Sequence, residues 1–441
     1  MAGAGMGEAD VARPWRILMV SEDLPGERIG GLGKHVVTLA NRLLQEGHEV
    51  EILGRNDRGP AAGAAQIGFR GRLRPGFDLA RPGWKELQMG VFNPLKRPHF
   101  ARRIGRAINA HAAGFDVVHY HGHLPMVGLS VAAGINFVQT RHDQGSECLT
   151  HLRFVDGAVC ENLVPGECSA CIRRGAGPVR KSVTALAVEG YRAQAARAFA
   201  RHKTVFVSEF LRRRFLRAVP GADLARSRVI HNFIDYPRLR DCARNVLDAL
   251  AGPAPRRGDL LLVGRIDAGK GFGEFLDAAG GRLPPHAIVT IVGDGPERAA
   301  LERRHGGARV RFLGWQEQDA TLALAARAHL CVVPSVCEEA CSTTVLEALA
   351  LGRACVALAR GGTPELAQYA QYPGQLALAA TMDELVALAA RRLAEQPRSA
   401  PPPETFGADA GRLLPRLLDL YADRTDLLDR HLHLEQRRHP G

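Results

Sequence analysis

The stretch Leu260-Leu261-Leu262-Val263-Gly264-Arg265, with Lys270-Gly271 following shortly after, decides the fold class of this chain. Its apolar run is typical of a strand buried on both faces of a parallel sheet. Two cations follow that strand, at the edge where open α/β sheets bind ligands. Arginine offers phosphate oxygens a planar fork, and lysine offers them a point charge. Two ordinary cations in a solvated loop remain the alternative.

Strand-like runs recur on both sides of this stretch. Earlier ones cover residues 16–21, 49–53, 117–121, 135–140 and 204–208, and later ones cover 287–292, 310–313, 330–333 and 354–357. Helical patterns separate them, and this alternation indicates parallel sheets with helices on both faces. The 441 residues exceed one ordinary core. We therefore expect an α/β fold with two doubly wound domains.

The domain boundary is expected where the alternation pauses, between Asp235 and Leu260. We predict an N-terminal Rossmann-like domain over residues 1–236, with a cysteine-containing insertion over 146–175, and a linker over 237–258. A second Rossmann-like domain is expected over 259–400. A helical segment over 401–441 then packs on the second domain or crosses back to the first.

The net charge and the distribution of apolar residues indicate the kind of partner and the location of the chain. The formal net charge of +12 suits a polyanionic partner, such as a nucleotide diphosphate, an acidic lipid, an anionic glycan or a nucleic acid. No apolar run reaches the ~18 residues that a membrane span needs. The first residues lack the apolar core of a signal peptide. We expect a cytoplasmic chain, with peripheral contact at the inner face of the membrane as a further expectation.

The run PSVCEEACSTTVLE, residues 334–347, contains two spaced carboxylates. Glu339 falls in the loop after a strand, and Glu347 falls eight residues later, inside the next helix. Thr343 and Thr344 lie near the expected helix start, where free N–H groups and the helix dipole favour a phosphate. Carboxylates accept hydrogen bonds from sugar hydroxyls. For Glu347, a capping-box contact with Thr344 is the alternative.

Together these residues resemble glycosyltransferase family 4, the retaining enzymes with the two-domain GT-B fold, over nearly the whole chain. The marks of the second half are Gly264-Arg265, Lys270-Gly271, Gly293-Asp294-Gly295-Pro296, Phe312-Leu313-Gly314, the glutamate pair, and Gly361-Gly362-Thr363-Pro364-Glu365. The resemblance implies two Rossmann-like domains that face each other across a cleft.

The resemblance also implies roles in donor binding. Arg265 and Lys270 would bind the diphosphate, Glu339 the sugar hydroxyls, and Glu347 the ribose. Gly295, Thr343 and Thr344 join the expected donor site. Ala340-Cys341-Ser342 replaces the bulky and glycine residues usual in the family, and this change bears on the identity of the donor sugar.

The N-terminal half of the chain is expected to form the other side of the cleft, opposite these donor residues. Gly30 to His35, GGLGKH, follows the first strand, and its glycines let the backbone approach a phosphate or sugar, with a flexible turn as the alternative. The family shows this loop at this place, so Gly31 joins the donor site.

His142, with Asp143, matches the Thr-x-His motif that the family places beside the donor sugar. A histidine can donate a hydrogen bond to a sugar hydroxyl or to a leaving-group oxygen. We expect His142 and Glu339 to be catalytic. His119 and His121 end a neighbouring strand, and either line the same cleft or are satisfied strand-end histidines.

The resemblance implies attack on the face from which the nucleotide leaves, with the departing phosphate oxygen taking the acceptor proton. No carboxylate nucleophile emerges from the first half, so the two-carboxylate scheme of glycosidases is not favoured. The expected reaction moves a hexose or N-acetylhexosamine from a nucleoside-diphosphate sugar to a cell-envelope glycan or lipid, or to a secondary metabolite. It requires no cofactor.

Two other functions remain open on this architecture. One is an epimerase or phosphorylase, although the glutamate pair disfavours the former and no lysine-anchored cofactor motif supports the latter. The other is a non-catalytic binder of a nucleotide sugar or a nucleic acid that has kept the fold.

Four of the nine cysteines are grouped in the insertion as C-x11-C-x7-C-x2-C: Cys148, Cys160, Cys168 and Cys171. One C-x2-C pair and two further thiols could close a structural zinc site. The long first spacing is not that of a standard zinc finger, so disulfide or redox chemistry and unligated thiols stay open.

Residues 70–106 contain ten Lys or Arg against two acidic residues, with Phe77, Trp84, Phe92 and Phe100 interleaved. This composition suits contact with an anionic membrane or acceptor. It also suits a single-strand nucleic-acid groove, but no recognition fold accompanies it, so nucleic acid is not expected. A solvated basic face is the plain alternative.

Overall fold

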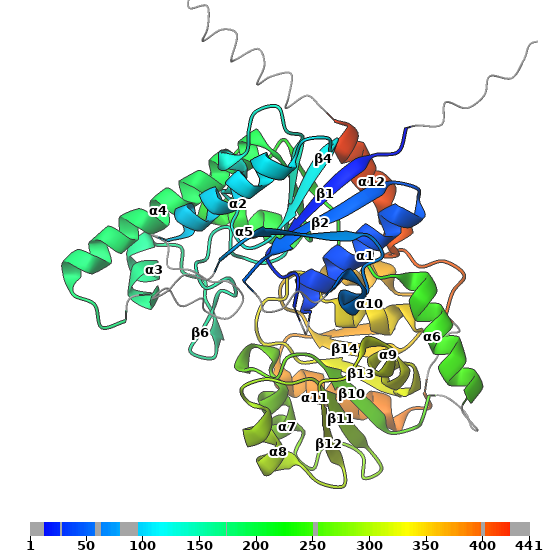
Figure 1. Ribbon diagram of the computed structural model, residues 1–441. Coiled ribbons are helices and arrows are strands. Elements are labelled where there is room, and N and C mark those ends of the chain that lie inside the picture. The colour runs from blue at the N-terminus through cyan, green and yellow to red at the C-terminus, as the bar shows by residue number, and fades with distance from the viewer. Residues whose placement is uncertain are drawn as a thin grey trace, which may run out of the picture.

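The computed structural model describes residues 13–26, 29–57, 63–79, 96–172, 174–249, 255–397 and 402–423. Figure 1 shows two α/β domains, each built on one parallel sheet with helices against it. This arrangement confirms the predicted class of two doubly wound sheets. Among the described helices, none has the length and apolar character that crossing a membrane requires.

The first sheet has seven parallel strands in the order β3-β2-β1-β4-β5-β8-β9. Their bounds are β1 Arg16–Ser21, β2 Glu49–Arg55, β3 Arg72–Phe77, β4 Val117–His121, β5 Phe137–Arg141, β8 Lys203–Phe206 and β9 Ser227–Val229. The winding reverses between β1 and β4. At such a reversal, loops leave the carboxyl ends of adjacent strands in opposite directions and open a crevice.

The second sheet repeats the scheme with six parallel strands in the order β12-β11-β10-β13-β14-β15. Their bounds are β10 Asp259–Val263, β11 Ile288–Val292, β12 Val310–Gly314, β13 Leu330–Val333, β14 Ala354–Leu358 and β15 Leu376–Ala379. Counted within the domain, this is the 3-2-1-4-5-6 order of dinucleotide-binding folds. The reversal lies between β10 and β13.

The helices bury apolar faces against these sheets. On α1, Val36, Leu39, Ala40 and Leu43 are each at most 1% exposed, and their helical spacing puts them on one face. The helices are α1 Gly31–Gln45, α2 Arg97–His111, α4 Pro178–Arg201, α5 Glu209–Ala218, α7 Phe272–Ala279, α8 Arg298–His305, α9 Gln318–Arg327, α10 Thr343–Ala350 and α11 Met382–Ala394. Short 3-10 turns cover η1 Ala64–Ile67, η2 Val127–Ser130, η3 Ala268–Lys270 and η4 Thr363–Tyr369.

The insertion between β5 and α4 forms a small unit of its own. It contains a two-stranded antiparallel ribbon, β6 Phe154–Val155 with β7 Ala158–Val159, and helix α3 Pro165–Ile172. Helix α3 packs on α4, and the two project from the first domain (Figure 1).

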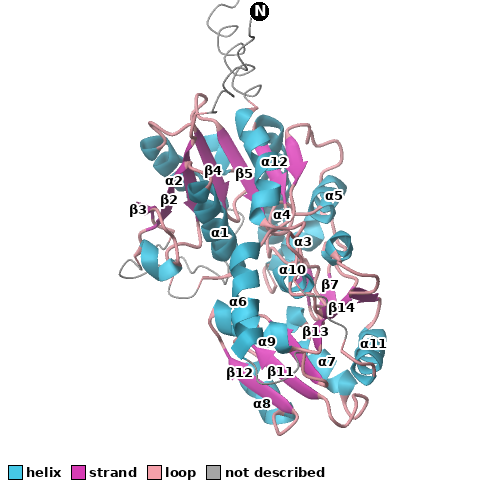
Figure 2. Cartoon of the chain, turned by 90° about the vertical axis from the view of Figure 1, so that its right-hand side faces the viewer, coloured by secondary structure: helices cyan, strands magenta, loops and turns pink. Residues whose placement is uncertain are grey.

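The chain crosses between the domains twice. After β9, helix α6 Tyr236–Ala249 packs against α9, so the segment expected as a linker begins with this helix. The chain later returns, and α12 Ala410–Ala422 packs against α1 of the first domain (Figure 2). The crossings meet at a parallel bridge between Ile234 and Asp409, where Ala410 N donates to Ile234 O at 2.9 Å.

Candidate active site

The predicted site residues follow strands near the centres of both sheets. Gly31 begins α1 after β1, and His142 follows β5. In the second domain, Arg265 follows β10 and Glu339 follows β13. All these strands are parallel, so each residue lies at the carboxyl edge of its sheet, where open α/β sheets bind ligands.

Lys270 and Glu339 form an ion pair at the centre of the predicted donor side. Glu339 Oε1 accepts from Lys270 Nζ at 2.5 Å and from Ser335 Oγ at 2.6 Å. Burial alone would raise the pKa of Glu339, but the Lys270 cation outweighs it and the pKa is lowered. Burial likewise opposes the charge of Lys270, and the Glu339 carboxylate reverses the effect and raises its pKa. Both groups are therefore charged at neutral pH.

Arg265 lies on the loop between β10 and the Lys270 turn. Its Nε lies 3.3 Å from Asp267 Oδ2, and its side chain is 37% exposed, so the guanidinium remains accessible to a ligand. The neighbouring loop approaches closely, since a Cβ on Gly295 would lie 2.2 Å from Ile266 O. Only glycine permits that approach of one loop to the other.

Helix α10 begins beside Glu339 and exposes a free N-terminus. Its N-cap residue, Ser342, makes no side-chain cap hydrogen bond. Thr343 and Thr344 are the first two helical residues, so Thr344 is not the N-cap and Glu347 is not its capping-box partner. Burial raises the pKa of Glu347 to about 6, while Lys34 on α1 acts in the opposite direction.

A glycine loop supports Glu339 from behind. Gly362 N donates to Glu339 O at 2.7 Å. The neighbouring Gly361 has a φ of 60°, and a Cβ there would lie 2.2 Å from Glu339 O. A side chain at position 361 would therefore push the Glu339 backbone out of place.

A cluster of three histidines, His35, His121 and His142, faces the same region from the first domain. His121 Nδ1 lies 3.1 Å from His142 Nε2, and the rings of His35 and His142 have centroids 4.6 Å apart. Burial lowers the pKa of all three, that of His35 to about 3. They are therefore neutral imidazoles. A Cβ on the nearby Gly31 would meet nothing within 4 Å, so α1 begins beside open space.

His119, in contrast, has two partners of its own. Its Nδ1 lies 2.6 Å from the Tyr421 hydroxyl and its Nε2 lies 2.7 Å from Thr140 Oγ1. It behaves as a satisfied strand-end histidine and joins β4 to helix α12.

Asp143 lies behind His142 and holds two further histidines. Its Oδ2 lies 2.5 Å from His123 Nδ1 and 3.2 Å from His151 Nδ1. Burial disfavours the carboxylate, but the two imidazoles outweigh it and lower the pKa of Asp143 well below its ordinary value. For His123, the Asp143 carboxylate overcomes burial and raises the pKa.

Among the described residues, two groups of mostly buried side chains have ligand atoms with the spacing of a metal site. They are His35, His121 and His142, and His123, Asp143 and His151, each with its atoms within 4.8 Å of one another. In the second group the hydrogen bonds to Asp143 already account for the arrangement.

Direct contacts join the two sides of the site. Gln144 Nε2 donates to Glu338 O at 3.3 Å, and Asn232 Nδ2 donates to Cys341 O at 2.9 Å. The loop that contains Glu339 is thus tied at two points to the first domain.

Three further residues at this site, His35, Asn232 and Glu365, are not among those predicted from the sequence. His35 lies one helical turn after Gly31, and this spacing is the sequence signal that could have identified it. Glu365 belongs to the Gly-Gly-Thr-Pro-Glu stretch that resembles the family, which by itself predicts no role for it. Its carboxylate accepts from the backbone N–H groups of Glu209 and Phe210 at 2.9 and 2.6 Å, at the start of α5.

Comparisons with known proteins agree with this arrangement. A family model described as Glycosyltransferase Family 4 matches residues 29–238, and one described as Glycosyl transferases group 1 matches residues 257–396. A curated relative, the glycogen synthase of Mycobacterium tuberculosis, is 27% identical over 421 residues and covers 87% of both chains.

Solved structures share the fold at low sequence identity. HepE of Anabaena, in complex with UDP, has a TM-score of 0.56 and 16% identity, over 96% of this chain and 100% of that one. Sucrose-phosphate synthase of Thermosynechococcus elongatus has a TM-score of 0.58 and 19% identity, over 96% and 98%. These likenesses confirm the predicted GT-B architecture.

Proposed function

We propose, since this chain belongs to the group 1 glycosyltransferases of family 4, that it moves a hexose or an N-acetylhexosamine from a nucleoside-diphosphate sugar to a hydroxyl acceptor. One observation carries the proposal: the pair of Lys270 and Glu339, 2.5 Å apart, sets a cation for the diphosphate beside a carboxylate for the sugar. The glycogen synthase relative and the HepE complex with UDP-glucose support a nucleotide-sugar donor.

In this proposal the diphosphate binds at the carboxyl edge of the second sheet. Arg265 and Lys270 neutralise its charge. The free N–H groups at Thr343 and Thr344 add hydrogen bonds, and the α10 dipole favours the anion. Glu347 then accepts hydrogen bonds from the ribose hydroxyls.

Both domains contribute to the sugar side of the reaction in this proposal. Glu339 accepts hydrogen bonds from the sugar hydroxyls, and the loop at Gly295 lets the backbone approach the phosphates. A neutral His142 can donate to a sugar hydroxyl near the departing oxygen. The N–H at Gly31 is a further donor at a helix start.

We propose transfer with retention, in which the acceptor attacks the face from which the nucleotide leaves. The acceptor oxygen bonds to the anomeric carbon, the bond to the phosphate oxygen breaks, and that oxygen takes the acceptor proton. Most of the catalysis is then stabilisation of negative charge on the leaving diphosphate.

The proposed acceptor is a cell-envelope glycan or lipid, or a secondary metabolite. Peripheral contact with an anionic membrane through residues 70–106 is supported by the exposed cations Arg70, Arg72, Arg102 and Arg106. Phe77, Arg97 and Phe100 of the same stretch are buried and cannot contribute. Residues 80–95, with Trp84 and Phe92, lie outside the described residues.

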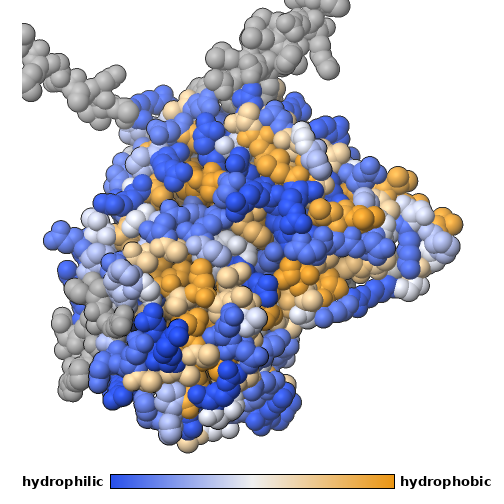
Figure 3. Space-filling model, turned by 180° about the vertical axis from the view of Figure 1, so that it is seen from behind, coloured by the Kyte–Doolittle hydropathy of each residue, from blue (hydrophilic) through white to orange (hydrophobic). Residues whose placement is uncertain are grey.

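A second surface suits the same contact. Val179, Val183 and Leu186 on α4 are 77%, 50% and 70% exposed and share one helical face. Arg180 and Lys181 lie between them in the sequence. Figure 3 shows apolar residues gathered at this projecting end of the molecule. An apolar helix face with cations beside it is typical of binding at a membrane surface.

Nucleotides and their sugars are expected to stabilise the protein against heat. A ligand at one hundred times its dissociation constant adds about 2.7 kcal/mol, which shifts Tm by several degrees. Thermal shift with UDP, ADP, GDP and their glucose and N-acetylglucosamine conjugates measures this effect. The stabilising sugar should also be hydrolysed slowly without acceptor. If nothing among these shifts Tm or releases sugar, the donor proposal is wrong.

Donor binding is expected to weaken at acidic pH. An ionised Glu347 offers both of its oxygens as acceptors to the ribose hydroxyls, whereas the protonated group is a weaker acceptor, and burial raises its pKa to about 6. KM for the donor should therefore rise as the pH falls below that value, by at most about tenfold for each pH unit. Glu347→Gln should bind the donor weakly at every pH, and its KM should lose this pH dependence. A wild-type KM that stays flat between pH 7 and 5 would contradict the role of Glu347.

A further inference from the structure

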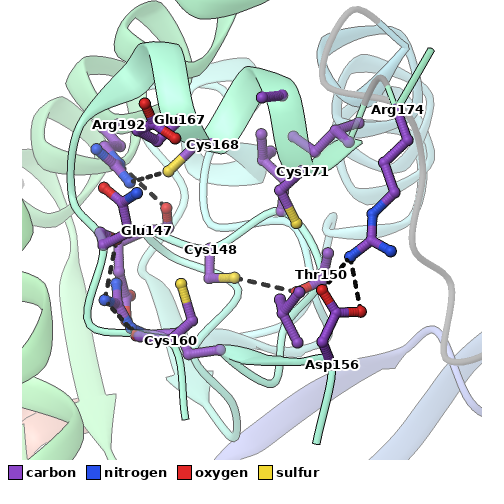
Figure 4. A pocket seen from close by; sticks show the side chains of 16 residues that line it. Glu147, Cys148, Thr150, Asp156, Cys160, Glu167, Cys168, Cys171, Arg174 and Arg192 are labelled. Atoms are coloured by element: carbon purple, nitrogen blue, oxygen red, sulfur yellow. Dashed lines mark hydrogen bonds and ion pairs between the residues drawn. The ribbon is translucent and has the colours of Figure 1, made fainter. Parts of the chain in front are cut away.

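The four cysteines of the insertion surround one cavity. Cys168 and Cys171 reach into it from α3, and Cys148 and Cys160 reach it from the opposite side (Figure 4). The cavity has a volume of about 370 Å³. Cys168 and Cys171 are three residues apart on this helix, so both thiols lie on the same face of it.

All nine cysteines of the chain are free, so none of the four is committed to a disulfide. The four thiols line the same cavity, but no three of their sulfur atoms lie within 4.8 Å of one another. A divalent cation at the centre would therefore draw the sulfurs together, and it would replace their protons because metal binding converts thiols to thiolates.

Arginines supply the positive charge that a cluster of thiolates needs. Arg192 Nη2 donates to Cys168 Sγ at 3.3 Å, and its Nε donates to Glu147 O at 3.0 Å. Arg153 donates twice to Cys160 O, at 2.8 and 3.0 Å. Hydrogen bonds of this kind orient the ligands of a metal and balance their charge.

We propose that Cys148, Cys160, Cys168 and Cys171 bind one structural Zn²⁺ that closes the insertion. Four thiolates fill the tetrahedral coordination of zinc and leave no open position, so the site is structural. Cys148 Sγ lies 3.2 Å from Thr150 Oγ1, and metal binding would replace this contact.

The insertion has little regular secondary structure to stabilise it without a metal. Its two strands have only two residues each. Three non-glycine residues, His151, Arg153 and Asp156, have φ values of 67°, 46° and 52°, which are unfavourable for residues with a Cβ. A metal at the centre holds this backbone in place, because its ligands come from both sides of the strained turn.

Ion pairs connect the proposed zinc site to the loop that contains Glu339. Glu161, directly after Cys160, pairs with Arg214 at 2.6 and 2.7 Å. Arg214 also pairs with Glu338 at 2.7 and 2.8 Å, and Glu338 precedes Glu339. A fixed insertion thus fixes the loop that contains Glu339.

Metal content and thiol count test the proposal on the wild-type full-length chain. Protein purified from zinc-supplemented cells under reducing conditions should contain one zinc per chain by elemental analysis. Denatured without reductant and with a chelator, it should titrate nine thiols. Absence of zinc, an iron–sulfur chromophore, or a count of five thiols, which means that the four cluster cysteines form disulfides, would each overturn the proposal.

Cobalt exchange and matched variants locate the metal. Co²⁺ in the wild-type chain should give the thiolate charge-transfer and tetrahedral d–d bands, and their absence counts against the site. Cys168→Ser with Cys171→Ser should lose the bound zinc, whereas Cys242→Ser, outside the cluster, should retain all of it. Hydrogen exchange over residues 146–175 should speed up when the zinc is chelated. If the double variant keeps its zinc, the ligand assignment is wrong.

Discussion

Replacing Lys270 with alanine is expected to lower kcat for sugar transfer by about 10²- to 10³-fold. The change removes the cation that opposes charge on the departing diphosphate. It also leaves the Glu339 carboxylate without the partner that lies 2.5 Å away, so an uncompensated negative charge meets the incoming phosphates. Initial rates of donor hydrolysis and of transfer measure the loss, and KM for the donor should rise with it.

Two further variants serve as controls for the effect of Lys270→Ala. Arg282→Ala removes a cation of the same domain whose partner, Asp383, is 82% exposed, so its rates should stay within about twofold of wild type. Lys270→Arg keeps the charge but changes its shape, so partial activity is expected. If Lys270→Ala folds normally and turns over at the wild-type rate, the donor site has been assigned to the wrong residues.

Asp143→Asn is expected to destabilise the first domain by about 3 kcal/mol, because it removes the buried carboxylate that pairs with His123 and His151. A loss of that size lowers Tm by roughly 6–12 °C in a domain of this length. Differential scanning calorimetry measures the shift. Asp383→Asn, at an exposed pair, is the matched control and should change stability by less than about 0.5 kcal/mol.

The pH dependence of this loss has a defined sign. The lowered pKa of Asp143 contributes stability above the unfolded carboxyl pKa of about 4, and that contribution falls as the pH drops. The raised pKa of His123 contributes below the unfolded imidazole pKa of about 6.5, and that contribution falls as the pH rises. The Tm difference between wild type and variant should therefore peak between these values. A difference that is constant from pH 3 to 8 would contradict the pairing.

The central strands and the edge strand β12 were predictable from the sequence, whereas the edge strands β3, β9 and β15 were not. Strands such as Leu330–Val333 are buried on both faces and therefore read as unbroken apolar runs. β3 reads RLRPGF, because it is an edge strand whose Arg74 pairs with Glu51 of β2 and whose Pro75 needs no inner partner. β9, with three residues, is too short to show any period.

The same limit applies to the site. Glu339, Thr343 and Glu347 could be proposed from the sequence because one loop and one helix contain them all. Contacts across the domain boundary carry no local signal: Asn232 meets Cys341 over 109 residues, and Gln144 meets Glu338 over 194. Such pairs depend on how two separately formed sheets face each other. The spacing of residues within one helix or loop does not predict this arrangement.

The bridge between Ile234 and Asp409 is the point where both covalent connections between the domains pass and are hydrogen-bonded to each other. The domains are also joined by apolar packing, since one continuous core cluster contains Val207 and Phe215 of the first domain with Val345 and Leu366 of the second. Moving one domain against the other would therefore break side-chain contacts such as that of Gln144 with Glu338 and would also expose apolar surface, at about 25 cal/mol for each Å². The relative placement of the two sheets is thus held by a shared core as well as by polar contacts.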